Sequence, residues 1–268
     1  MTMIRTPGQR VSRLRLVDSN TLRAEEGSHL CIVDVAAGPA GKHTRTLSVS
    51  VAPHATLTVV SIIPPEFSAS VHFVQHGAVE AGGGIHWWNA VFGGMNVQHE
   101  LISEVTGEGG ESTINWLFLA RAEQHYNLHV KNLFHAPHGK GEVAMKGVAC
   151  GRARVGCHGA IVIGEDGDGT STHLTQHILM LDASAKVDAV PALEIKTNDV
   201  KARHSATVTK VSADDLFYMG SRGISLEEAR RLCVEGFLAA LIDRLPVASL
   251  RDELYTMIHG SCEQSTIG

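Results

Sequence analysis

The chain has 268 residues, of which 44% are hydrophobic and 19% charged, and its formal net charge is −5. This length allows one large domain with a sizeable core and a small appendage. The negative charge argues against nonspecific nucleic-acid binding, and no run approaches the roughly 20 apolar residues of a membrane-spanning helix.

Cysteine usage and the start of the chain indicate a compartment. The five cysteines form no Cys-x-x-Cys pair, and residues 1–15 are polar and basic without an apolar core. These features favour a reducing environment and argue against a signal peptide. We therefore expect a cytoplasmic protein that binds neither nucleic acid nor a membrane.

Short strands dominate the chain up to about residue 212. Residues 1–45 are poorly patterned, apart from a strand at 28–35 and a loop at 36–41. From Thr46 onward apolar and polar residues alternate with the period of two that is typical of strands. Further strands are predicted at 84–92, 96–105, 111–120, 125–133, 142–149, 154–163, 172–182 and 193–196. The pattern predicts an all-β body, and sandwich, barrel and solenoid are all compatible with periodicity alone.

Helices follow the strands. They are predicted at 212–219, 225–244 and 247–259, with Pro246 separating the last two. Ser225 is a good N-cap because its hydroxyl can accept a hydrogen bond from an orphan backbone N–H, and Glu228 completes a capping box. The apolar stripe predicted for the long helix consists of Ala229, Leu232, Cys233, Gly236, Phe237 and Ala240. We therefore divide the chain into a β core at 1–208 and a C-terminal helical domain at 209–268.

A series of motifs spans the junction of these two parts. In order they are Leu193-Glu194-Ile195, Asn198-Asp199-Val200-Lys201, His204-Ser205-Ala206-Thr207, Leu216-Phe217-Tyr218 and Ser221-Arg222-Gly223-Ile224-Ser225. Their order and spacing resemble the C-terminal signature of the SufB/SufD family, scaffold components of the SUF iron–sulfur cluster assembly machinery. The resemblance is strong from about residue 108 to 237. It implies a mainly β fold, a right-handed parallel β-helix whose open end is covered by a small α-helical C-terminal cap. We expect a short form that lacks the helical N-terminal extension.

The resemblance also implies a metal site. His204 matches a histidine that the family associates with cluster assembly, although Ala202 and Ser205 replace the cysteine and the glutamate found there in SufD-type and SufB-type members. His177 stands where SufB-type members place a cysteine. Both histidines are expected to lie near one another and bind a transient Fe–S cluster or iron, and Glu194 could add an oxygen ligand. The alternative is that His204 only packs or hydrogen-bonds and that Glu194 stabilises a strand edge.

Other histidines and cysteines have plainer interpretations. His125, Asn127 and His129 lie on one face of a predicted strand, which indicates a solvated face or a transient metal site. Cys150 and Cys157 are interpreted as buried structural residues.

Nucleotide-binding and zinc-protease motifs are incomplete. A segment ending in Gly41-Lys42 lacks the earlier glycine and the Ser or Thr of a phosphate loop, and His99-Glu100 is followed by Ser103 where a second histidine is needed. We therefore expect no nucleotide on this chain and no enzymatic activity.

Partner proteins are the remaining implication of the resemblance. The C-terminal helices would dock a SufC-like ABC-type ATPase through Leu216, Phe217, Tyr218 and Arg222, and the strand around His204 would form a homodimer or a heterodimer with a paralogous scaffold. The expected function is a scaffold for Fe–S cluster assembly. Two alternatives stay open: an interaction scaffold without cluster chemistry, and a carbohydrate-acting β-helix enzyme, which needs clustered carboxylates in a groove.

Overall fold

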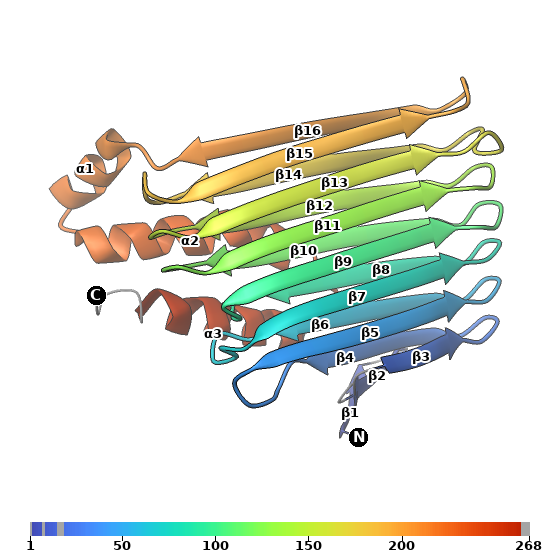
Figure 1. The fold of residues 1–268 in the computed structure, drawn as a ribbon, viewed down its shortest axis with the longest axis horizontal. Coiled ribbons are helices and arrows are strands. Elements are labelled where there is room, and N and C mark those ends of the chain that lie inside the picture. Colours follow the sequence, from blue (N-terminus) through green and yellow to red (C-terminus); the bar gives the residue numbers. More distant parts are fainter. Residues whose placement is uncertain (1, 7–8, 15–18, 264–268) are drawn as a thin grey trace.

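Sixteen strands wind into a flattened coil in the computed structural model, which describes residues 2–6, 9–14 and 19–263 (Figure 1). Successive strands from β3 onward join two facing sheets in turn, so the chain completes one turn of a solenoid with every pair of strands. All neighbouring strands are parallel except β1 and β2. The mainly β fold and the parallel solenoid predicted from the sequence are confirmed.

Each sheet is a continuous ladder. Sheet A has nine strands: β1 (Thr2–Thr6), β2 (Gln9–Leu14), β4 (His29–Val35), β6 (Thr56–Ile63), β8 (Gly84–Val91), β10 (Glu111–Ala120), β12 (Lys140–Ala149), β14 (Ser171–Met180) and β16 (Lys201–Lys210). Sheet B has seven strands: β3 (Ser19–Ala24), β5 (Lys42–Val51), β7 (Ser70–Val79), β9 (Asn96–Val105), β11 (His125–Phe134), β13 (Arg154–Ile163) and β15 (Lys186–Ile195). The short strands β1, β2 and β3 lie in the stretch that has no clear periodicity.

Alternating side chains fill the space between the two sheets. In β7, Val71 and Phe73 are 4% and 1% exposed, whereas His72 between them faces outward. Parallel register stacks equivalent positions, so apolar residues form columns that run through successive turns. Glycine is required where a column carries a large ring: a Cβ on Gly77 would lie 2.6 Å from Cζ2 of buried Trp87.

Three helices follow the strands: α1 (Ala213–Ser221), α2 (Leu226–Ile242) and α3 (Ala248–Glu263). The Oγ atom of Ser225 accepts a hydrogen bond from the backbone N–H of Glu228 at 3.2 Å, as the predicted N-cap requires. The hydroxyl of Ser212 caps α1 in the same way through the N–H of Asp215, at 3.0 Å. None of the helices within the described residues is long and apolar enough to cross a membrane.

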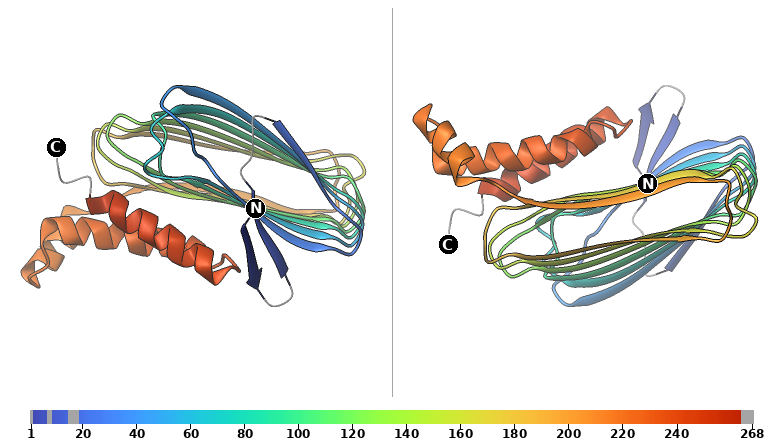
Figure 2. Two further views of the ribbon diagram at one scale, coloured as in Figure 1. Left: turned by 90° about the horizontal axis from the view of Figure 1, so that it is seen from below. Right: turned by 90° about the horizontal axis from the view of Figure 1, so that it is seen from above.

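The three C-terminal helices are present as predicted, but they do not cover the open end of the solenoid. They lie along the outer flank of sheet A, and the last turn of the coil is left uncovered (Figure 2). The reason is chemical complementarity, because the outer face of sheet A is apolar over β4 to β14. The residues of α2, α3 and the segment between them that are buried against that flank and against each other are Val234, Leu238, Leu241, Ile242, Leu245, Val247, Leu250, Leu254 and Ile258.

The predicted stripe of α2 is also partly wrong. Ala229 is buried as expected, but Leu232 is 41% exposed, and Gly236 and Ala240 face outward. Two ion pairs link the helical region to sheet A and its loops: Arg244 pairs with Glu142 of β12, and Arg230 Nη2 lies 2.7 Å from Oδ1 of Asp182 in the loop after β14. The helices are therefore fixed to sheet A by both apolar packing and ion pairs.

Candidate functional site at the exposed end of the solenoid

The last turn of the coil, β15 and β16, forms an uncovered surface (Figure 2). β15 pairs only with β13, and β16 pairs only with β14, so each strand leaves one row of backbone N–H and C=O groups unpaired by a strand of the described chain. Every residue of β16 except Ala202 is exposed. An edge of this kind is a template for strand pairing with another chain.

Charge and apolar surface alternate on this end. β16 carries Lys201, Arg203 and Lys210 and no acidic residue. The valines Val190 and Val208 are 48% and 43% exposed. Cations on an edge strand oppose indiscriminate strand addition, so the surface favours a partner with a complementary charge.

His204 lies in the middle of this surface. The parallel register pairs it with Leu174 of β14, whose side chain points into the solenoid interior and is 1% exposed. His204 is therefore on the inward side of its strand, but no further turn of the described chain covers it, so the imidazole is exposed. No hydrogen bond or ion pair joins this ring to another described residue, so a ligand would not have to displace a partner.

His177 points the other way. It pairs in register with Thr207 and Lys146, both on the outer face of sheet A. The ammonium of Lys146 lies 4.4 Å from the centroid of the Phe237 ring of α2, and burial there lowers the pKa of the lysine. His177 thus lies on the helix-covered face of sheet A, and the expectation that it lies beside His204 in one chain is wrong.

Glu194 does not join either histidine. It lies on the outer face of sheet B, in register with Val162, and its carboxylate is 3.2 Å from the ammonium of Lys196. The three predicted ligands therefore point to three different faces. Within the part of the chain that the structure describes, no three His, Cys, Asp or Glu side chains are arranged to hold a metal ion.

Cys150 and Cys157 are buried thiols with raised pKa rather than ready metal ligands. Cys157 is fully buried beneath the last turn, in register with Ala189, and burial raises its pKa. Burial likewise raises the pKa of Cys150 to about 11, and its Sγ lies 3.5 Å from the carbonyl oxygen of Ala120. The prediction that both are buried is confirmed, and a thiol with a raised pKa is a poor nucleophile and ligand.

A second exposed surface lies on the helices. Phe217 and Tyr218 of α1 are 79% and 59% exposed, and Leu226 and Leu232 of α2 are 61% and 41% exposed. The guanidinium of Arg222 lies 5.2 Å from the Tyr218 ring. We call these five residues the helical patch. The predicted residue Leu216, which precedes Phe217 in α1, is only half-buried.

Leu226 and Leu232 are surface residues that sequence reasoning does not identify. The predicted buried stripe includes Leu232, because helical spacing does not reveal which of two apolar faces meets the sheet. Leu226 follows the N-cap directly, and an apolar residue at the first helical position seldom reaches the core. That position is the signal that could have found it.

Fold and surfaces together define a class: a parallel β-solenoid with an uncovered C-terminal end and exposed apolar residues on its helices. The sequence comparisons give the family. The family described as SUF system FeS cluster assembly, SufBD core domain, matches residues 9–237. The chain belongs to the SufBD family, and that family takes part in SUF iron–sulfur cluster assembly.

Several curated relatives agree with this assignment. An iron–sulfur cluster assembly SufBD family protein of Mycobacterium tuberculosis is 28% identical over 207 residues, which cover 76% of this chain and 24% of that protein. The assembly protein SufD of Bacillus subtilis is 29% identical over 174 residues, 65% of this chain and 40% of SufD. SufB of the same organism is 30% identical over 141 residues, 53% of this chain and 30% of SufB. The chain thus matches less than half the length of each of these relatives.

Proposed function

We propose that this protein is a non-enzymatic scaffold that holds iron or a nascent Fe–S cluster at the uncovered end of its solenoid and docks an ABC-type ATPase on its helical patch. The observation that carries the proposal is His204, an exposed imidazole without a partner among the described residues, on an edge strand that is open to a second chain. Neutral imidazole is a common ligand for iron.

The ligand set is incomplete in one chain, so a second scaffold chain supplies the rest. Pairing of two β16 edges about a two-fold axis would bring two copies of His204 toward one interface. A paralogous scaffold in the same position would supply a thiolate or carboxylate in place of the second imidazole. A homodimer and a heterodimer would offer different ligands but would use the same edge.

The ATPase would use a separate surface. The helical patch combines aromatic anchors, Phe217 and Tyr218, with the charge of Arg222, and such residues carry most of the binding energy in protein interfaces. Because α2 is packed on sheet A and linked to it by the Arg230–Asp182 ion pair, movement of a bound ATPase would be transmitted to the solenoid.

Iron loading tests the site. Anaerobic reconstitution with iron and sulfide should give less bound iron per chain for His204→Ala than for the wild type, while dimer mass stays unchanged. His177→Ala is the matched control, because this histidine lies on the opposite face of sheet A. Equal loss in both variants, or no loss in His204→Ala, would show that the uncovered end does not hold iron through His204.

Docking is tested with a purified ABC-type SUF ATPase. Phe217→Asp places a charge in an apolar contact and should weaken binding by about 2 kcal/mol or more, a factor of roughly 30 in the dissociation constant. Met95→Asp is the control, since Met95 is 49% exposed but lies on the β8–β9 loop. Equal affinity of both variants in a titration would place the docking surface elsewhere.

The interaction scaffold without cluster chemistry is the second candidate. It is favoured by Ala202 and Ser205, which stand where the family pattern has its cysteine or glutamate, and by Cys157, a buried thiol whose pKa is raised by burial. A protein that binds the ATPase through the helical patch but retains no iron in the reconstitution would support it.

A further inference from the structure

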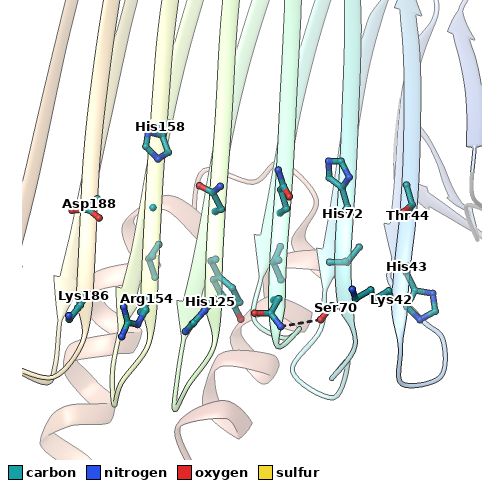
Figure 3. Close-up of a pocket in the computed structure, with 18 residues that line it drawn as sticks. Lys42, His43, Thr44, Ser70, His72, His125, Arg154, His158, Lys186 and Asp188 are labelled. Carbon is teal, nitrogen blue, oxygen red and sulfur yellow. Dashed lines mark hydrogen bonds between the residues drawn. The ribbon is translucent and has the colours of Figure 1, made fainter.

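A shallow groove crosses the outer face of sheet B, the broad face that the helices leave uncovered (Figure 3). Its volume is about 620 Å³, and it runs across the beginnings of the strands from β5 to β15. The residues that hold iron or dock the ATPase in the proposed function do not line it. The groove is therefore independent of the proposed function.

Basic residues line one edge of this groove. His125, Arg154 and Lys186 are the first residues of β11, β13 and β15 and are neighbours in register. They lie in a row, and Lys42 occupies the equivalent first position on β5 (Figure 3). Neighbouring strands are about 4.8 Å apart, so the first three side chains follow one another at that interval.

These charges are not neutralised by the protein itself. No ion pair joins Lys42, Arg154 or Lys186 to another residue that the structure describes, and Asp188 is the one carboxylate among the described lining residues. Glu100, on the next column of β9, is already engaged by His72 at 3.3 Å. The groove therefore presents net positive charge on a chain whose overall charge is −5.

Uncharged polar side chains form the floor between the cations. Asn96, Gln98 and Asn127 line the groove together with Ser70 and Thr44. Amide side chains donate and accept hydrogen bonds at once, as a peptide backbone requires. Asn96 donates to Ser70 Oγ at 3.2 Å, which leaves capacity for a ligand.

The chemistry disfavours single-stranded nucleic acid, which needs exposed aromatic rings for base stacking. Tyr126 is the only tyrosine, tryptophan or phenylalanine among the described lining residues; it is 2% exposed and donates its hydroxyl to the carbonyl of Gly93 at 2.9 Å. An open groove over six strands is also too exposed to enclose a small ligand, which typically has about 70–90% of its surface buried.

We propose that this groove binds an extended acidic segment of a partner protein, with carboxylates over the row of cations and backbone amides over the amide side chains. The groove spans five strand intervals from β5 to β15, about 24 Å at roughly 4.8 Å each. An extended peptide rises about 3.3 Å per residue, so about seven residues fill the groove. An acidic segment of that length reaches from Lys42 at one end of the groove to Arg154 and Lys186 at the other.

The test uses the full chain and a fluorescein-labelled decapeptide of alternating Glu and Ser, measured by fluorescence anisotropy at low salt. The same peptide with Gln in place of Glu is the ligand control. Arg154→Glu/Lys186→Glu should raise the dissociation constant at least tenfold. Lys131→Glu is the protein control, because Lys131 is exposed on the same face of β11, six residues from His125 and about 20 Å along the strand.

Each outcome decides the proposal. The proposal is supported if the wild type binds the Glu peptide but not the Gln peptide, if the double variant loses this binding, and if Lys131→Glu retains it. Equal weakening in Lys131→Glu shows a general charge effect, and absence of binding to the wild type shows that the groove takes no such segment; either result overturns the proposal. Displacement of the peptide by equimolar inorganic pyrophosphate would also overturn it, by assigning the cations to a small phosphate ligand instead. Circular dichroism confirms that the variants are folded.

Discussion

Gly77→Ala is the sharpest test of the solenoid interior. Gly77 lies on β7, faces inward, and has backbone dihedrals that alanine can adopt. An added Cβ would lie 2.6 Å from Cζ2 of Trp87 and 3.0 Å from Cδ1 of Ile85. Trp87 cannot move freely, because it is fully buried and its Nε1–H donates to Ser103 Oγ at 3.1 Å.

The expected loss follows from this overlap. Carbon atoms in contact are about 3.5–4.0 Å apart, so a neighbour must move by about 1 Å, and overpacking of this kind costs about 1–3 kcal/mol. Alanine also lowers the conformational entropy of the unfolded chain, and this stabilises the folded state by about 0.4–1 kcal/mol and offsets part of the packing cost. We therefore expect Gly77→Ala to lower the free energy of unfolding by about 1–2 kcal/mol.

Urea unfolding followed by circular dichroism measures this change. Gly236→Ala is the control, because Gly236 is exposed within α2 and a Cβ added there meets no atom within 4 Å. The free energy of unfolding of that variant should rise by about 0.5–1 kcal/mol, since alanine stabilises a helix more than glycine does. In Trp87→Phe the smaller ring leaves room, so adding Gly77→Ala there should cost less than it does in the wild type. Equal costs in the two backgrounds, or a Gly77→Ala variant as stable as the wild type, would refute the packing argument.

Two further predictions concern stability. Leu238→Ala removes a fully buried α2 side chain from the flank of sheet A. It should lower the free energy of unfolding by about 2–5 kcal/mol, measured by urea unfolding. His99 lies between Phe73 and Trp116, and burial lowers its pKa to about 3. It stays neutral when folded but binds a proton when unfolded below pH about 6.5, so stability falls as pH drops from there toward 3. At pH 5 the neutral, buried His99 lowers the free energy of unfolding by about 2 kcal/mol relative to pH 7. The loss of stability between pH 7 and pH 5 should therefore be smaller by about that amount in His99→Gln than in the wild type. An unchanged loss would contradict the lowered pKa of His99.

The strands can be predicted from the sequence, but the place of the helices cannot. Strict alternation in β7 and β9 reveals their inward residues, because only one face of each is buried. In β10 the run from Trp116 to Ala120 is buried on both faces. A continuous apolar run indicates that both sides are covered, and this is the signal that a second layer packs on sheet A.

Pro191 explains why the sequence predicts one strand too short. The prediction begins only at Leu193, since proline removes a backbone donor from a ladder. The structure places Pro191 within β15, opposite Gly159 of β13, with no described strand on its other side. Proline is tolerated on such an edge, so its presence marks the end of the sheet.

The candidate site is harder to predict than the fold. Both His204 and His177 can be chosen as candidate ligands because they are histidines. Whether their side chains lie close together depends on the register between strands. Register pairs His204 with Leu174, three residues from His177, and an odd separation puts the two side chains on opposite faces. The opposite orientation of the two histidines can be recognised only from the register between β14 and β16. That register depends on the lengths of the loops that join the two strands through β15.

The two ends of the described solenoid differ in a way that limits how copies can assemble. The C-terminal end offers two ten-residue strands, whereas the N-terminal end offers β1, a five-residue strand that runs antiparallel to β2, and the six-residue β3. Head-to-tail stacking would have to join edges of unequal length, and in sheet A β1 runs against the direction of the other strands. A filament forms when one end of each copy pairs with the opposite end of the next, so the two ends must match. When two identical ends pair about a two-fold axis, the long edges of both copies are covered. Among the described residues the mismatch thus disfavours head-to-tail growth into a fibre, and the long edges of β15 and β16 stay unpaired within one chain.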